Sequence, residues 1–165
     1  MATFRERLAF DVARGELKDA DRRYLLVRDD TLMAIFRELP PAARDQALAS
    51  LARAVVLHGS DSARAYFEST GGDGAKLWKV VVDTAPQLGW GVWRILESGP
   101  RSLKLAVANS PFASGYGSSD TPVCHAITGM LTAVGQIVWG GEVVATETQC
   151  TATGAPECRF EVVAK

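Results

Sequence analysis

The chain has 165 residues, of which 47% are hydrophobic and 22% charged, and its formal net charge is −1. This length suits one domain with its own core, and the near-neutral charge gives no reason to expect direct binding to nucleic acid or to an anionic membrane surface. No apolar run approaches the roughly 20 residues that span a bilayer, and the N-terminus lacks a signal-peptide pattern. Three cysteines cannot all pair within one chain, which favours a cytoplasmic location over a disulfide framework.

The first half of the chain is predicted to begin with a short, mobile lead-in over residues 1–20, where apolar residues at helical spacing are interrupted by Gly15. A single domain is expected to follow over residues 21–165. It should open with a strand at residues 23–28 and a helix capped by Asp29 or Asp30. A long helix should begin at Pro41, since proline suits the first helical position, and end in the glycine-rich loop 70–74.

The second half is predicted to combine two hairpins with two helices. Residues 75–87 favour a helix, although three successive valines weaken that interpretation. Strands are expected at 89–97 and 102–108, where apolar and polar residues alternate, followed by a loop over 109–120. An apolar helix over 121–139 should precede a closing hairpin, with strands at 142–150 and 158–163. The order of elements predicts an α+β fold, in which helices cover a mostly antiparallel sheet.

The cysteines give the first functional hypothesis. Cys150 and Cys158 flank the turn of the closing hairpin, and Cys124 lies near the start of the preceding helix. With Glu147, three thiols and one carboxylate could form a tetrahedral zinc site without an open position, which would make it structural rather than catalytic. However, Glu147 and Cys150 have opposite parity along an ideal strand, so a bulge or twist would be needed to aim both at one point.

The alternative is that the cysteines are ordinary core residues. Free cysteine is among the most buried residue types, and no Cys-x-x-Cys pair is present. His125 could also replace Glu147 as the fourth ligand, because imidazole is a common zinc donor. A structural role for His125 is the other interpretation, and His58 is expected on an exposed helix face.

At these residues the chain resembles the 4-vinyl reductase domain family. The resemblance covers about residues 105–163 and rests on NSPFA at 109–113, PVCHAITG at 122–129, ETQC at 147–150 and CRFEV at 158–162. This family includes the sensor domains of phenol- and xylene-responsive transcription activators and a protein associated with bacteriochlorophyll synthesis. Its fold resembles that of Golgi transport-particle subunits. In the phenol sensors, one cysteine before a helix and a glutamate and two cysteines on the last hairpin bind zinc, which implies Cys124, Glu147, Cys150 and Cys158 as ligands here.

The resemblance also implies a dimer and a pocket for a hydrophobic or aromatic small molecule, between helices and sheet. Such pockets are mostly apolar, with a few polar groups. Each candidate could equally be ordinary core. The residues that could line the pocket are Trp78, Trp90, Trp93, Leu105, Val107, Phe112, Tyr116 and Met130.

Three functions are compatible with this pattern. The first is a zinc-stabilised homodimeric binding or sensor domain. The second is an accessory protein of bacteriochlorophyll synthesis, which would bind or deliver a tetrapyrrole; no reductase cofactor motif is visible, so catalysis is the weaker form of this hypothesis. The third is a scaffold similar to the transport-particle subunits, which would not need the cysteines.

Overall fold

The main sheet of the protein has four antiparallel strands. In this computed structural model, which describes residues 3–165, the strands are β4 (Val92–Gly99), β5 (Ser102–Ala108), β6 (Val143–Gln149) and β7 (Cys158–Ala164), in the spatial order β4-β5-β7-β6. Side chains along β7 alternate between buried and exposed positions, so one face of the sheet packs on the core while the other faces solvent.

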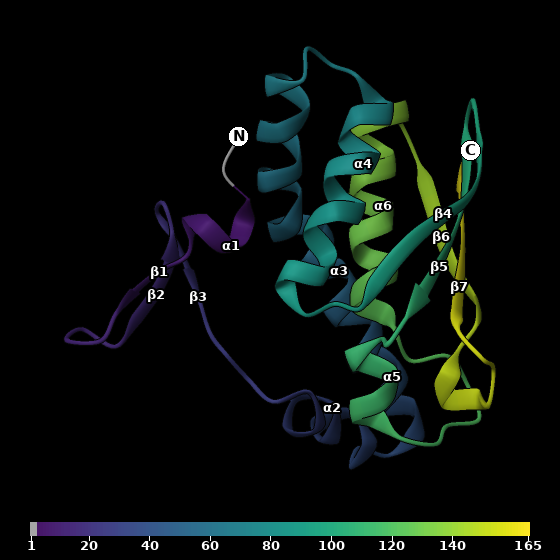
Figure 1. Cartoon of the computed structure of the whole chain (residues 1–165). Helices are drawn as coiled ribbons and strands as arrows, with labels where there is room; N and C mark the ends of the chain where they lie inside the picture. The colour runs from purple at the N-terminus through teal and green to yellow at the C-terminus, as the bar shows by residue number, and fades with distance from the viewer. Residues whose placement is uncertain (1–2) are drawn as a thin grey trace.

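Helices cover the inner face of this sheet in two layers (Figure 1). The apolar helix α6 (His125–Trp139) lies directly against β6 and β7, and the long helix α3 (Pro41–Ser69) packs on α6 from the other side. The remaining helical segments are α1 (Phe4–Arg7), α2 (Asp29–Arg37), α4 (Gly74–Thr84) and α5 (Pro111–Tyr116), with 3-10 turns η1 (Ala85–Leu88) and η2 (Thr151–Thr153).

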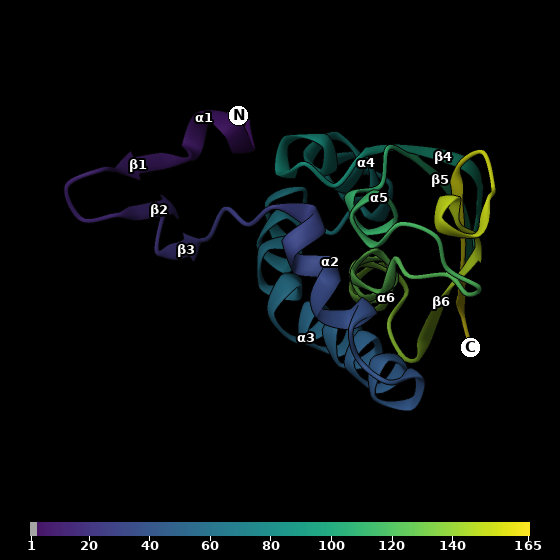
Figure 2. The same cartoon turned by 90° about the horizontal axis from the view of Figure 1, so that it is seen from below.

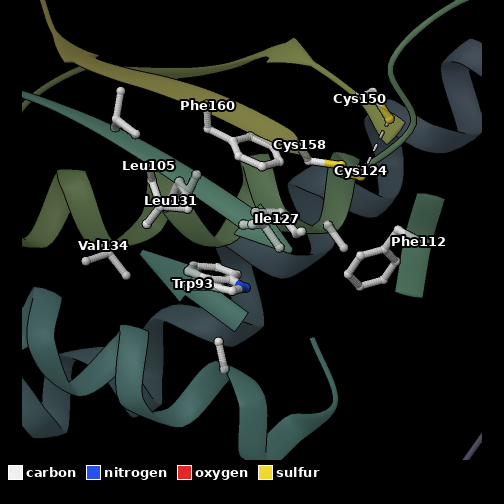
Figure 3. Close-up of a cluster of buried hydrophobic side chains, with 14 of the residues drawn as sticks. Trp93, Leu105, Phe112, Cys124, Ile127, Leu131, Val134, Cys150, Cys158 and Phe160 are labelled. Atoms are coloured by element: carbon white, nitrogen blue, oxygen red, sulfur yellow. Dashed lines mark hydrogen bonds between the residues drawn. The ribbon is translucent and has the colours of Figure 1, made fainter. Parts of the chain in front are cut away.

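The core lies between α6 and the sheet and continues to α4 and α5. Leu105 and Val107 of β5 and Ile127 and Leu131 of α6 are fully buried within it. Burial of each such side chain is worth about 1.5–3 kcal/mol, so this layer contributes a large part of the hydrophobic stabilisation. Figure 3 shows the core extending without interruption to the three cysteines.

The N-terminal segment forms a small separate sheet that projects from the helices (Figure 2). Its antiparallel strands are β1 (Ala9–Asp11), β2 (Glu16–Asp19) and β3 (Arg22–Tyr24). The arm, defined here as residues 3–28, contacts the rest of the chain where Arg5 N donates to Gln87 Oε1. It also leaves several apolar side chains exposed, among them Phe10, Val12, Leu25, Leu26 and Val27.

The predicted α+β class is confirmed, as are the long helix from Pro41, the helix after Gly74, the helix before Gly140 and both hairpins. The helix at residues 74–84 forms despite its valines because Asp73 caps it: the Asp73 side chain accepts a hydrogen bond from Lys76 N. This cap offsets the weaker helix propensity of β-branched residues.

Three local predictions were wrong. Residues 4–12 do not form one helix, because the chain leaves the short α1 and enters β1. The strand expected at 23–28 ends at Tyr24, and Leu25 and Leu26, 83% and 78% exposed, have no strand partner. The expected loop 109–120 contains α5, and its missed signal was Ser110 at the N-cap before Pro111 at the first helical position. The division at residues 20/21 stays a prediction, although β3 pairs with β2 across it.

Within residues 3–165, none of the helices combines the length and the apolar composition needed to cross a membrane.

A close approach between α3 and α6 predicts an asymmetric response to glycine substitution. A Cβ atom at Gly129 would lie 2.4 Å from the Ala52 carbonyl oxygen, whereas a Cβ atom at Gly59 would meet only the flexible end of Met130. Gly129→Ala should therefore destabilise the protein by about 1–3 kcal/mol through overpacking. Gly59→Ala should be neutral or stabilising by up to about 1 kcal/mol, because alanine favours a helix. Urea denaturation of both variants checks this, and equal effects would contradict it.

Candidate metal centre

Three cysteines and one glutamate converge at one end of the core. The candidate ligand atoms of Cys124, Glu147, Cys150 and Cys158 all lie within 4.8 Å of one another. Cys124 Sγ is 3.7 Å from Cys158 Sγ and 3.9 Å from Cys150 Sγ, and all three side chains are fully buried (Figure 3). The chain thus assembles four donor groups from segments that are up to 34 residues apart.

The turn between β6 and β7 brings two of the sulfurs together. Cys150 follows the last residue of β6 and Cys158 begins β7. The carbonyl oxygen of Cys150 accepts hydrogen bonds from Thr153 N and Ala155 N, which folds the segment back on itself. Gly154 ends η2 with a φ of 92°, a left-handed conformation that a glycine adopts without strain.

An irregularity in β6 aims Glu147 at the same point as Cys150. Glu147 pairs with Phe160 and Gln149 pairs with Arg159, so two residues of β6 advance against one of β7. Because the extra residue reverses the alternation of side chains, Glu147 and Cys150 reach the same side of the hairpin. The bulge that the sequence required for a shared site is therefore present.

Cys124 enters the cluster from the N-terminus of α6. It is the N-cap residue of that helix, and its backbone N–H donates to Glu147 Oε2 at 2.9 Å. The first N–H groups of a helix carry a partial positive charge, which favours negative charge on nearby thiol and carboxyl groups. This contact also ties α6 to the bulged part of β6.

Burial and hydrogen bonds shift the pKa values of these groups in opposite directions. Burial raises the pKa of the Glu147 carboxyl from 4.5 to about 7. Hydrogen bonds from the thiols of Cys124 and Cys150 lower the pKa of Cys158 to about 2, and Thr151 N–H, 3.4 Å from Cys158 Sγ, acts in the same direction. The pKa of Cys124 is raised, because its thiol donates its proton within the cluster. Without a cation, the cluster thus holds its negative charge mainly on Cys158.

The donor atoms fit a metal ion. One carboxyl oxygen of Glu147 accepts from Cys124 N, whereas the other, Oε1, is buried without a hydrogen-bond partner among the described residues. A buried carboxylate oxygen without a partner is unfavourable, and a cation would satisfy it. Three sulfurs and one oxygen at this separation could hold a metal ion.

The two histidines lie outside this group. His125 follows Cys124, but the described cluster does not include it, so the alternative in which His125 replaces Glu147 is not favoured. Its Nδ1 atom is buried without a hydrogen-bond partner among residues 3–165, and burial lowers the pKa of the imidazole. His58 is exposed on α3, as expected.

The residues predicted to line a ligand pocket lie in the adjoining core. Trp90 and Met130 are partly buried and pack against it, and the other six are buried: Trp78, Trp93, Leu105, Val107, Phe112 and Tyr116. The Trp90 and Phe112 rings make an edge contact with centroids 5.1 Å apart, and Trp93 Nε1 donates to the Trp90 carbonyl oxygen. Their role as pocket residues stays a prediction.

Two surface depressions lie elsewhere. One, of about 200 Å³, is formed at the β4–β5 turn and the adjoining part of β7. The other, of about 360 Å³, lies between α5 and η2, beside the cysteine cluster. Neither is lined by the eight predicted residues.

Two residues that contact the sulfur atoms were missed from the sequence. Ser110 Oγ lies 3.2 Å from Cys124 Sγ, and Thr151 N donates to Cys158 Sγ. The only sequence signal for Ser110 was its position before a proline, and Thr151 adjoins Cys150. Their contacts depend on tertiary structure.

The region that carries the cluster matches a known family: residues 103–164 match the 4-vinyl reductase domain. A segment of 78 residues is also 38% identical to the bacteriochlorophyll synthase 23 kDa chain of Cereibacter sphaeroides. That match covers 47% of this chain and 36% of the relative, so it spans little more than a third of the relative's length.

Solved structures share the fold. The phenol-responsive sensory domain of the transcription activator PoxR, solved with phenol, superposes with a TM-score of 0.82 at 18% identity over 95% of this chain and 84% of that one. A trafficking protein particle complex subunit 3 from Naegleria fowleri, covalently bound to palmitic acid, gives 0.55 at 9% identity over 83% and 95% of the two chains. These comparisons confirm the predicted resemblance and the fold shared with transport-particle subunits.

The raised pKa of Glu147 predicts a pH-dependent stability difference in the metal-free protein. The folded state binds the Glu147 proton more tightly than the unfolded state, so its stabilising effect is present below about pH 4.5 and is lost as the pH rises through about 7. The free energy of unfolding of the wild type, relative to Glu147→Gln, should fall over this range by up to about 3 kcal/mol. The cysteines are common to both proteins, so the difference isolates the carboxyl group.

Urea denaturation in the presence of a chelator, at intervals from pH 4.5 to 8, measures this difference. Glu142→Gln, which changes an exposed carboxylate on the same hairpin that pairs with Lys165, is the matched control. A wild-type minus Glu147→Gln difference that stays constant with pH would contradict the assignment.

Proposed function

We propose that the chain is a zinc-stabilised domain that binds a hydrophobic or aromatic small molecule. The observation that carries this proposal is the buried convergence of Cys124, Glu147, Cys150 and Cys158 beside an aromatic core. The match to the 4-vinyl reductase domain over the same residues and the fold shared with a phenol-responsive sensory domain support it.

Zinc suits the donor set. Thiolate ligands select soft or borderline metals, and tetrahedral sites with three or four cysteines are typical of structural zinc. Bound zinc would neutralise the thiolates and the carboxylate and would cross-link the α6 N-terminus to the β6–β7 hairpin. Because all four positions would be filled by the protein, we assign the site a structural role and the protein a binding function rather than an enzymatic one.

The aromatic part of the core is the proposed ligand-binding region. Trp90 and Phe112 pack edge to face next to the buried Trp93, between β4 and α5. Aromatic rings interact well with other aromatic rings in offset or edge-on geometry, which favours a small aromatic ligand. The phenol-bound state of the PoxR sensory domain, with which this chain shares its fold, supports this choice.

A second candidate is an accessory function in bacteriochlorophyll synthesis, in which the domain binds or delivers a tetrapyrrole. The 38% identity over 78 residues to the bacteriochlorophyll synthase 23 kDa chain favours it. Both candidates need an apolar cavity, and they differ in its size: a porphyrin ring requires a much wider opening between α5, α6 and the sheet than a phenol does.

We further propose that the protein is a homodimer of the cytoplasm. The arm exposes Phe10, Val12 and Leu25, and α2 and α3 expose Ile35 and Leu57. Exposed apolar side chains that gather into a patch mark an interaction site, and a second copy would supply both surfaces at equal stoichiometry. The three free thiols suit a reducing compartment.

Metal analysis tests the zinc centre. The wild type, purified without chelator, should contain about one zinc ion per chain, and Cys158→Ser should lose most of it. The variant should melt at least about 10 °C lower, because loss of a structural metal removes several kcal/mol and each kcal/mol shifts the melting temperature of a domain this size by about 2–4 °C. Val163→Ser, at an exposed position of the same strand, is the matched control. A wild type without metal that melts together with Cys158→Ser would refute the centre.

Native mass spectrometry separates the two ligand classes and reports the number of subunits. Protein expressed in its source cells should carry a small aromatic molecule or a porphyrin, in a complex with the mass of a dimer. Purified protein is then titrated with phenol and with protoporphyrin, and tryptophan fluorescence is followed. Phe112→Leu should weaken binding of the favoured probe several-fold, since it removes the ring that contacts Trp90.

Phe10→Leu, in the exposed arm, is the control and should leave probe binding unchanged. Protein that carries no ligand from cells and responds to neither probe would contradict the binding function.

A further inference from the structure

Ser110 connects the metal centre to the short helix α5. It lies between the end of β5 and the start of α5, is 2% exposed, and places its Oγ atom 3.2 Å from Cys124 Sγ. A buried hydroxyl needs hydrogen-bond partners, and this one has a sulfur on one side and the α5 backbone on the other.

The second contact of Ser110 determines the direction of the first. As the N-cap of α5, Ser110 Oγ accepts a hydrogen bond from Ala113 N at 3.5 Å. The hydroxyl has a single proton, which this acceptor role leaves free. A metal-bound Cys124 would be a thiolate, which can only accept, so the hydroxyl proton would be directed at Cys124 Sγ.

We infer that Ser110 is a positioning residue, whose hydroxyl donates to the Cys124 thiolate and couples occupancy of the metal centre to the placement of α5. This inference rests on the proposed metal centre. Groups that hydrogen-bond to metal ligands orient them and tune the metal, and their loss typically lowers metal affinity 10–100-fold. The sequence motifs by themselves give Ser110 no such role.

The backbone around Ser110 leaves it little freedom. Asn109 has a φ of 57°, a left-handed conformation that turns the chain from β5 into α5. The carbonyl oxygens of Ala108 and Asn109 lie so close to Gly91 that a Cβ atom there would be 2.5 and 2.9 Å away. Because this segment is packed directly against β4, the Ser110 side chain is held at the sulfur.

The other end of α5 is held independently of the cluster. Arg37 Nη1 donates to the Tyr116 carbonyl oxygen, and Arg44 Nη1 donates to the Tyr116 hydroxyl. Gly115 lies against α2, where a Cβ atom would be 2.5 Å from the Asp29 carbonyl oxygen. A helix of six residues is unstable alone, so α5 depends on these contacts at its C-terminal end and on Ser110 at its start.

This arrangement links the metal to the proposed ligand region. α5 carries Phe112 and Tyr116, and the Phe112 ring contacts Trp90. A metal that fixes the Cys124 thiolate would fix the partner of Ser110 and thereby the first turn of α5. Loss of the metal would leave that turn with the Ala113 cap alone.

Cobalt substitution provides the test, because cobalt–thiolate charge-transfer bands report directly on the electron density at sulfur. Ser110→Ala removes both the hydrogen bond to sulfur and the cap, whereas Ser110→Gly removes the hydrogen bond but keeps a residue well tolerated at an N-cap. Both variants should shift the charge-transfer bands of the cobalt-loaded protein and weaken zinc binding about 10–100-fold in chelator competition. Ser114→Ala, which removes a hydroxyl of α5 bonded to Asp29, should change neither.

Hydrogen exchange of residues 111–116 tests the coupling. In the wild type, chelation of the metal should accelerate amide exchange in this segment; in Ser110→Gly, exchange should already be fast with metal bound. Unchanged cobalt bands and zinc affinity in both Ser110 variants would overturn the inference while leaving the metal centre intact. A wild type that binds neither cobalt nor zinc would instead refute the metal centre itself.

Discussion

The convergence of three sulfur atoms and one carboxyl group on a single buried point is the constraint on which the rest of the domain depends. Acidic groups withdrawn from water are costly unless a cation or hydrogen bonds compensate for them. Here the α6 N-terminus, Thr151 N–H and the Ser110 hydroxyl all face the cluster. The β6 bulge, the left-handed Gly154 and the Cys124 cap are the local features that make this convergence possible.

The cluster joins layers that would otherwise meet only through apolar packing. Cys124 belongs to the helical layer and Glu147, Cys150 and Cys158 to the sheet, so a metal ion would fix the angle at which α6 leaves the sheet. Apolar contacts between α6 and β5 or β7 are non-directional and tolerate small shifts, whereas ligand bonds do not. The aromatic residues of β4 and α5 lie at the end of the core that this geometry would hold most firmly, which is where we place ligand binding.

The N-terminal arm follows a different principle. Its strands have three or four residues each, and the segment after Tyr24 exposes apolar side chains to solvent. So small a sheet is only marginally stable alone. Its shape therefore depends on contacts such as that of Arg5 with Gln87 and, in our proposal, on a second copy of the chain.

The sequence by itself determined the elements whose residues carry a strong local signal. Pro41, the glycines at 71–74 and 140–141 and the alternation along β5 and β7 marked helices, loops and strands correctly, and the spacing of Glu147, Cys150 and Cys158 already required a bulge. Only tertiary structure decided that Leu25–Val27 is not a strand, because a strand needs a partner that local sequence does not specify. Tertiary structure alone also placed Ser110 at Cys124 Sγ, since that contact joins the end of a strand to the start of a helix 14 residues later.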